Sequence, residues 1–186
     1  MSATTVGYCG GLLPDPSYKA VCGDPAYSDY AEAISLDYDP SVLSYDDVLD
    51  AFFRCHDAIS GGRSRQYSSI IFCHDEGQRR SAERAVAARP RVSTSIEAGQ
   101  PFWAAEPYHQ KWLLQRKRPL MLALGVQTPE ELLCSPAATV LNAAASRRLT
   151  PSKALQRLQV LVEEGKLSLQ TLEDVRAALH VEFRDS

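Results

Sequence analysis

The sequence predicts an α+β fold: a two-layer sandwich with a mixed sheet covered by helices, plus a C-terminal helical extension. Segments with the alternating or β-branched pattern of strands occur at residues 4–9, 35–40, 67–72 and 92–96. Helical patterns lie between the later strands, and only helical patterns follow Pro119. Elements of these two kinds bury their apolar faces by packing in layers. We therefore expect one domain at residues 1–118 and a helical extension at 119–186.

The chain opens with a strand that ends in a glycine turn. Val6 and Tyr8 alternate as strand residues do, and Gly7, Gly10 and Gly11 allow a sharp turn and the close approach of another group. A side chain here is expected at the end of a strand, facing a cleft. The segment 14–24 that follows contains two prolines and is expected to form a loop.

Capping residues and apolar stripes mark the helices. Ser44 precedes an acidic first turn and a stripe of apolar residues at helical spacing, made of Tyr45, Val48, Leu49, Phe52 and Phe53. A second helix begins at Asp75-Glu76 and ends at Arg89-Pro90, and a third is expected over 106–118. In the extension, helices are expected after Thr128, Thr150 and Ser168, and the last two helices form an apolar hairpin that must pack on something.

The composition is that of an ordinary globular protein. Hydrophobic residues make up 45% of the chain and charged residues 23%, and the net charge of −3 provides no general attraction to nucleic acid or to anionic membranes. No apolar run approaches the length of a membrane span, and the N-terminus has no charged start followed by an apolar segment. We expect a cytoplasmic protein with neither a nucleic-acid nor a membrane partner.

The five cysteines include no Cys-x-x-Cys pair, so free thiols in a reducing compartment are expected in place of a secreted disulfide framework. The triplets Cys55-His56-Asp57 and Cys73-His74-Asp75 repeat one pattern, which raises the alternative of a zinc site. Adjacent side chains rarely bind one ion together, so we expect no metal.

Several short motifs follow one another in a specific order. They are Gly7-Tyr8-Cys9-Gly10-Gly11, Cys22-Gly23-Asp24, Tyr30-Ala31-Glu32-Ala33, Gln66-Tyr67-Ser68 and Ala105-Glu106-Pro107-Tyr108-His109-Gln110-Lys111. In this order they resemble peptide methionine sulfoxide reductase A, an oxidoreductase of protein repair under oxidative stress, over residues 4–118 and more loosely to 148. The resemblance implies reduction of methionine S-sulfoxide in peptides and proteins. It further implies thioredoxin or dithiothreitol as external reductant and no bound cofactor.

Reduction of a sulfoxide by a thiol needs a thiolate that attacks sulfur and an acid that protonates the departing oxygen. The resemblance places the acid on Glu32 and the two oxygen-binding hydroxyls on Tyr8 and Tyr67. We expect these three side chains to converge and Glu32 to be partly buried between its flanking alanines. The alternatives are a solvated acid at a strand edge and tyrosines that serve only in packing.

Two departures from the family bear on activity. The family's nucleophile lies in a Gly-Cys-Phe-Trp segment before the glycine turn, and because this sequence starts at Met1 we expect an N-terminally truncated form that lacks it. The loop between His56 and Gln66 is shorter than the family's and has no acidic residue before the Gln-Tyr pair. The candidate surrogate or resolving thiols are Cys9, beside Tyr8, and Cys134, in the C-terminal region.

Three functions remain open. The first is a thiol-dependent methionine sulfoxide reductase, whose turnover is expected to be poor without the nucleophile segment. The second is a catalytically inactive member that binds methionine sulfoxide or meets a partner through its helical hairpin. The third is a thiol- or zinc-based regulator that uses the two Cys-His-Asp triplets. Titration with a methionine sulfoxide peptide separates the first two, and bound metal would favour the third.

Overall fold

The computed structural model describes residues 3–62 and 64–183 and divides into two compact units. Residues 5–106 form one of them, which we call the sheet unit. Residues 107–183, together with Ala3 and Thr4, belong to the other, which we call the helical unit. The division falls after residue 106, and the separate domain boundary expected after residue 118 stays a prediction.

The strands lie in two sheets. Strands β1 (Ala3–Cys9), β2 (Ala31–Asp37) and β5 (Phe102–Ala104) form a sheet of order β2-β1-β5. Strands β3 (Ile70–Cys73) and β4 (Ser95–Ala98) form a parallel pair, whereas β1 and β5 are antiparallel, with Tyr8 opposite Trp103. The predicted α+β class with mixed strand directions is confirmed, with the strands divided between two sheets.

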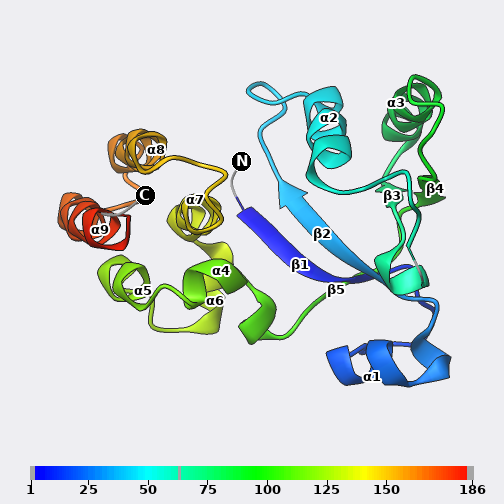
Figure 1. Cartoon of the computed structure of the whole chain (residues 1–186), viewed down its shortest axis with the longest axis horizontal. Coiled ribbons are helices and arrows are strands. Elements are labelled where there is room, and N and C mark those ends of the chain that lie inside the picture. Colours follow the sequence, from blue (N-terminus) through cyan, green and yellow to red (C-terminus); the bar gives the residue numbers. More distant parts are fainter. Residues whose placement is uncertain (1–2, 63, 184–186) are drawn as a thin grey trace. The chain divides into compact units, whose positions relative to one another are not determined.

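Helices α2 (Tyr45–Cys55) and α3 (Glu76–Ala87) pack on the β3–β4 pair (Figure 1). The packing joins Leu49 of α2, Ile71 of β3 and Ala82 of α3 in one buried cluster. The cap of α2 is as predicted: the Ser44 side chain accepts from the Asp47 N–H, and the Asp47 carboxylate accepts from the Ser44 N–H. These two helices and the β3–β4 pair therefore form one packed part of the sheet unit.

The loop expected over residues 14–24 is wrong, because Tyr18–Gly23 form helix α1. The Ser17 hydroxyl accepts a hydrogen bond from the Ala20 N–H at 3.3 Å and thereby caps the helix. A helix of about one and a half turns is too short to show an apolar period, so the Ser17 cap is the only sequence signal for α1. Figure 1 shows α1 beyond the end of β1, on the side away from α2 and α3.

Two further expectations are corrected at element boundaries. Strand β3 begins at Ile70, and Tyr67 lies just before it in the 3₁₀ helix η2 (Arg65–Tyr67). The single helix expected over 106–118 is divided into η3 (Pro107–His109), α4 (Trp112–Gln115) and the start of α5 (Arg118–Leu124). The break before α4 is at Lys111, whose φ of 46° is incompatible with a right-handed helix.

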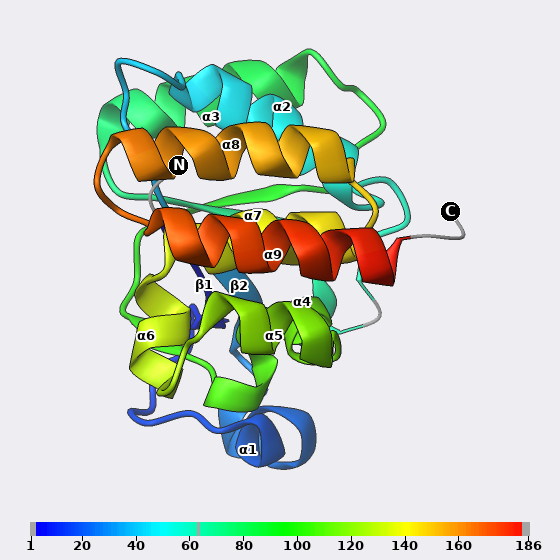
Figure 2. The same cartoon turned by 90° about the vertical axis from the view of Figure 1, so that its left-hand side faces the viewer.

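The helical unit continues with α6 (Pro129–Cys134), α7 (Pro136–Ala145), α8 (Pro151–Glu163) and α9 (Leu169–Glu182). Helices α8 and α9 lie side by side, with α7 behind them and α5 next to α9 (Figure 2). The predicted caps at Thr128 and Thr150 are confirmed, and Ser168 caps α9 in the same way: each side chain accepts from the N–H three residues ahead. Among the described residues, no helix combines the length and apolar character that a membrane span requires.

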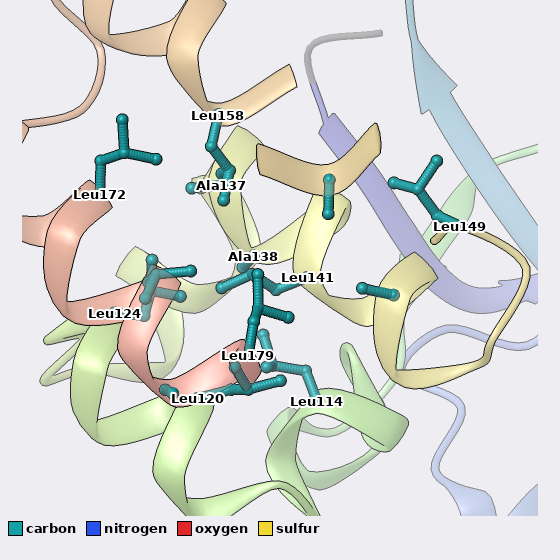
Figure 3. Packing of buried hydrophobic residues seen from close by; sticks show 14 of the residues in the cluster. Leu114, Leu120, Leu124, Ala137, Ala138, Leu141, Leu149, Leu158, Leu172 and Leu179 are labelled. Atoms are coloured by element: carbon teal, nitrogen blue, oxygen red, sulfur yellow. The ribbon is translucent and has the colours of Figure 1, made fainter. Parts of the chain in front are cut away.

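The predicted hairpin of α8 and α9 covers its apolar stripes within the helical unit. Leu158 of α8 and Leu179 of α9 point toward Leu141 of α7 and Leu120 of α5, and all four side chains are buried (Figure 3). The hairpin therefore completes a core of its own unit, and packing supplies the stability that short isolated helices lack.

Candidate functional site

Helix α1, strand β2 and helix η2 bring together five polar side chains, which we call the Glu32 cluster: Tyr18, Cys22, Glu32, Gln66 and Tyr67. The Gln66 amide connects them, because its Nε2 donates to Glu32 Oε1 at 2.8 Å and to Cys22 Sγ at 3.2 Å. Both hydrogens of one NH₂ group are thereby used, which fixes the side chains of three elements relative to one another.

The partial burial expected for Glu32 is wrong. Ala31 is buried, and because side chains alternate along β2, its neighbour Glu32 points to solvent and is exposed. Tyr67 is 59% exposed and Tyr18 43% exposed. The cluster is therefore a surface site that a side chain of another protein can reach.

The two tyrosines of the cluster stay protonated near neutral pH. The negative charge of Glu32 raises the pKa of Tyr67 above its ordinary value. A hydrogen bond with Cys22 raises the pKa of Tyr18. Both phenols keep their O–H groups, so each remains a hydrogen-bond donor for an incoming acceptor oxygen.

We expect Glu32→Gln to lower the pKa of Tyr67 toward that of an ordinary tyrosine, because removal of the nearby negative charge makes the phenolate less costly. Titration of tyrosine Cζ by ¹³C NMR measures this value, and the resonance missing from Tyr67→Phe assigns it. Glu173→Gln, which removes an exposed carboxylate from α9, is the matched control. An unchanged Tyr67 titration in Glu32→Gln would contradict the assigned proximity.

Tyr8 is buried, whereas Glu32 and Tyr67 are exposed, and the convergence of the three side chains stays a prediction. Tyr8 is 2% exposed and packs against Val21 of α1 and Tyr30. Its hydroxyl donates to Glu106 Oε2 at 3.0 Å, and Glu106 Oε1 accepts from the Tyr18 N–H at 2.8 Å. Tyr8 and Glu106 therefore hold the first turn of α1, the helix that carries Tyr18 and Cys22. The oxygen-binding role of Tyr8 stays a prediction.

An ion pair fixes the helix that carries Gln66 and Tyr67. The Arg65 guanidinium binds both carboxylate oxygens of Glu97 on β4, at 2.6 and 2.7 Å, and its Nε donates to the Asp29 carbonyl at 3.0 Å. The Arg65 hydrogen bonds lower the pKa of Glu97, so the pair stays charged over the neutral range. Helix η2 is thereby connected to β4 and to the segment just before β2.

The two thiols proposed from the sequence lie outside the cluster's hydrogen bonds. Cys9 is buried, its Sγ donates to the Gln100 carbonyl at 3.6 Å, and burial raises the pKa of its thiol. Cys134 is exposed at the end of α6, in the helical unit. The assignment of either as a surrogate or resolving thiol stays a prediction.

The Cys-His-Asp triplets have other roles in the structure. The His56 ring lies 2.8 Å from the Phe52 carbonyl and 2.7 Å from Ser69 Oγ, which joins the end of α2 to the start of β3. Within residues 3–62 and 64–183, no three histidine, cysteine or acidic side chains are grouped as a metal ion requires.

Comparison with known proteins decides the family. A family model described as "Peptide methionine sulfoxide reductase" matches residues 1–131, which is more than half of the 186-residue chain. The chain belongs to the peptide methionine sulfoxide reductase family. The resemblance inferred from the motifs is thereby confirmed, whereas the missing nucleophile segment stays a prediction.

Individual relatives agree with this family assignment. Peptide methionine sulfoxide reductase MsrA of Methanothermobacter thermautotrophicus is 38% identical over 128 residues, covering 62% of this chain and 75% of that protein. Peptide methionine sulfoxide reductase A5 of rice, Oryza sativa subsp. japonica, is 33% identical over 183 residues, covering 92% of this chain and 70% of that protein. The rice match includes the helical unit. The chain spans only 56% of the length of another relative, peptide methionine sulfoxide reductase of Drosophila melanogaster.

A solved structure supports the fold of the family. The crystal structure of Mxr1 from Saccharomyces cerevisiae in reduced form superposes with a TM-score of 0.52 at 30% identity. The match covers 59% of this chain and 68% of that one. The α+β architecture of this methionine sulfoxide reductase family member is therefore shared with the solved structure of Mxr1.

Sequence reasoning missed Tyr18, Cys22, Gln66 and Glu106 as parts of the site. Tyr18 lies in the segment 14–24 and the other three lie inside the family motifs, so the sequence contains them but no pattern indicates their roles. The signal for Cys22 and Tyr18 was the Ser17 cap, since a helix at 18–23 places residues i and i+4 on one face. Tyr18 and Cys22, which the sequence placed in a loop, are therefore neighbours on one face of α1.

Proposed function

We propose that the Glu32 cluster binds the sulfoxide group of methionine S-sulfoxide in proteins and reduces it to methionine. The observation that carries this proposal is the Gln66 amide, which holds an acid and a thiol on one surface beside a protonated tyrosine. Family membership supports the same reaction. The oxidoreductase activity of this chain, its stereochemistry and its reductant are parts of the proposal.

The cluster provides what a sulfoxide oxygen needs. That oxygen is a strong hydrogen-bond acceptor, and it becomes more basic as the sulfur is attacked and the S–O bond breaks. The Tyr67 hydroxyl remains a donor because its pKa is raised, and Glu32 is the proposed route by which a proton reaches the departing oxygen. The two groups therefore act on the same atom at successive stages.

The reaction consumes two thiol groups. One thiol sulfur takes the oxygen from the sulfoxide, which leaves methionine and a sulfenic acid, and an external dithiol then converts the sulfenic acid back to a thiol while releasing water. The net change is sulfoxide plus dithiol giving sulfide, disulfide and water. Thioredoxin supplies the dithiol in the proposal, with dithiothreitol as its replacement in vitro.

The exposure of the cluster fits a substrate carried on another protein. Tyr18 and Tyr67 are each exposed by more than two fifths, and their rings offer apolar surface for the S-methyl group next to their polar hydroxyls. A flexible methionine sulfoxide side chain can reach such a site without entering a deep cavity. Oxidised methionine in proteins is therefore the proposed partner.

We expect the chain to reduce dabsylated methionine S-sulfoxide with dithiothreitol and to leave the R epimer unchanged, because the thiol and the acid lie at fixed positions that only one epimer can match. Separation of substrate and product by chromatography, for each epimer, measures the outcome. Saturable binding of the S epimer without product would contradict the reductase and favour the inactive binding protein. Equal reduction of both epimers would contradict the proposed stereochemistry.

A further inference from the structure

Arg65 is the residue just before the Gln66-Tyr67 pair, and the sequence motifs give it no role. Its guanidinium is hydrogen-bonded to two other segments of the sheet unit. We propose that Arg65 is a positioning residue that holds the Tyr67 hydroxyl and the Glu32 carboxyl group toward one common point. This inference rests on the proposed function and adds to it the group that keeps the two polar side chains together.

The first contact of Arg65 fixes helix η2 to strand β4. Both carboxylate oxygens of Glu97 accept from the guanidinium, Oε1 from Nη1 at 2.6 Å and Oε2 from Nη2 at 2.7 Å. Two parallel hydrogen bonds between planar groups fix orientation as well as distance, which a single ammonium contact does not. The start of η2 therefore has one preferred position relative to β4.

The second contact fixes the same guanidinium to the segment before β2. The Arg65 Nε donates to the Asp29 carbonyl at 3.0 Å, and Asp29 lies three residues before Glu32. The Asp29 Oδ2 in turn accepts from the Leu12 N–H at 3.0 Å. One side chain therefore joins the start of η2, which carries Tyr67, to the entry of the strand that carries Glu32.

The glycine turn after β1 lies close against this guanidinium. Gly10 has a φ of 91°, and a Cβ atom there would lie 2.8 Å from Arg65 Nη2 and 3.1 Å from Phe72 Cζ. A glycine permits both this backbone conformation and this close approach. Packing against the turn thus adds to the hydrogen bonds in restricting where the guanidinium can lie.

The hydrogen bond from Gln66 to Glu32 would hold the two polar groups only weakly by itself. It is a single bond at 2.8 Å between side chains that solvent reaches, and water competes for both partners. The Arg65 and Glu97 side chains are less open, at 32% and 29% exposed. Since a misplacement of about 1 Å at a reacting group can cost about 10²-fold in rate, the restraint from Arg65 bears directly on turnover.

The test replaces Arg65 by lysine, which keeps the positive charge and loses the paired hydrogen bonds to Glu97. Tyrosine ¹³C NMR measures the Tyr67 titration, and steady-state kinetics with methionine S-sulfoxide and dithiothreitol measure turnover. The raised pKa of Tyr67 comes first from Glu32, so this pKa falls when the two groups move apart. We expect Arg65→Lys to lower the Tyr67 pKa toward its ordinary value and to lower kcat/KM by about 10²-fold.

Arg89→Lys is the matched control. The Arg89 side chain is also 32% exposed and also binds a carboxylate and a carbonyl, Asp50 on α2 at 2.6 Å and Ala85 on α3 at 2.8 Å. Neither helix carries a residue of the Glu32 cluster, so Arg89→Lys is expected to change neither the Tyr67 titration nor kcat/KM, even where it lowers stability.

Chemical rescue distinguishes positioning from a general loss of structure. In Arg65→Ala, added guanidinium at concentrations far below those that unfold proteins is expected to restore part of the Tyr67 titration and of kcat/KM. Urea has a similar planar shape without the charge and is expected to restore neither. Glu97→Gln, which weakens the same pair from β4, is a second variant and is expected to lower the Tyr67 pKa in the same direction.

The outcomes separate the inference from the proposed function. A Tyr67 titration that is unchanged in Arg65→Lys and in Glu97→Gln would overturn the positioning role, whatever the activity. Equal changes in Arg65→Lys and Arg89→Lys would also overturn it, because the cause would then be a general loosening of the fold. If the titration changes as expected but the unmodified chain forms no methionine, the positioning role stands and the proposed reductase fails.

Discussion

Glu32→Gln is expected to lower kcat/KM for methionine S-sulfoxide by about 10² to 10⁴-fold, the usual contribution of a general acid. Glutamine has nearly the same shape and still meets the Gln66 amide through its carbonyl oxygen, but it has no acidic proton for the departing oxygen. Because protonation is needed in the transition state and not for binding, the loss should lie in kcat, with KM little changed. Steady-state kinetics with dithiothreitol measure both constants.

The matched control is Glu173→Gln, which makes the same change on exposed α9 and is expected to leave both constants unchanged. If Glu32→Gln turns over within threefold of the unmodified chain, Glu32 is not the proton donor and the cluster has been assigned the wrong role. A rise in KM at constant kcat would instead make Glu32 a binding group.

The fold was largely predictable because most elements are long enough to show a period or a cap. The capping box at Ser44 and the threonine and serine caps of the extension placed α2, α6, α8 and α9 correctly. Helix α1 was missed because six residues between prolines and Gly23 show no apolar period. The division of 106–118 was missed because the αL backbone of Lys111 depends on its surroundings and has no sequence signal.

The candidate site was predictable only in part. Glu32 and Tyr67 were found through family motifs, and the structure places the Glu32 carboxylate close enough to raise the pKa of Tyr67. The link from Gln66 to Glu32 spans 34 residues and that to Cys22 spans 44, so no local pattern could reveal either. Strand alternation, in contrast, was available from the sequence and would have placed Glu32 on the open face once Ala31 was assigned to the core.

A second large effect is expected from a substitution in the short loop before Gln66. In this loop the backbone of Gly62 lies against that of Tyr67. A Cβ atom at Gly62 would lie 2.4 Å from both the carbonyl carbon and the carbonyl oxygen of Tyr67. Backbone atoms cannot rotate aside as a flexible side chain does, so Gly62→Ala must displace helix η2 and with it the Tyr67 hydroxyl. A misplacement of about 1 Å at a reacting group can cost about 10²-fold in rate.

We therefore expect Gly62→Ala to lower kcat/KM by about 10²-fold and the free energy of unfolding by about 1–3 kcal/mol, the usual cost of overpacking. Steady-state kinetics and urea unfolding measure the two effects. Gly23→Ala is the matched control, because a Cβ there meets no atom within 4 Å and the residue ends helix α1. If Gly62→Ala keeps full activity, the precise position of Tyr67 does not matter for the reaction. If it loses stability but no activity, the tight loop serves the fold and not the Glu32 cluster.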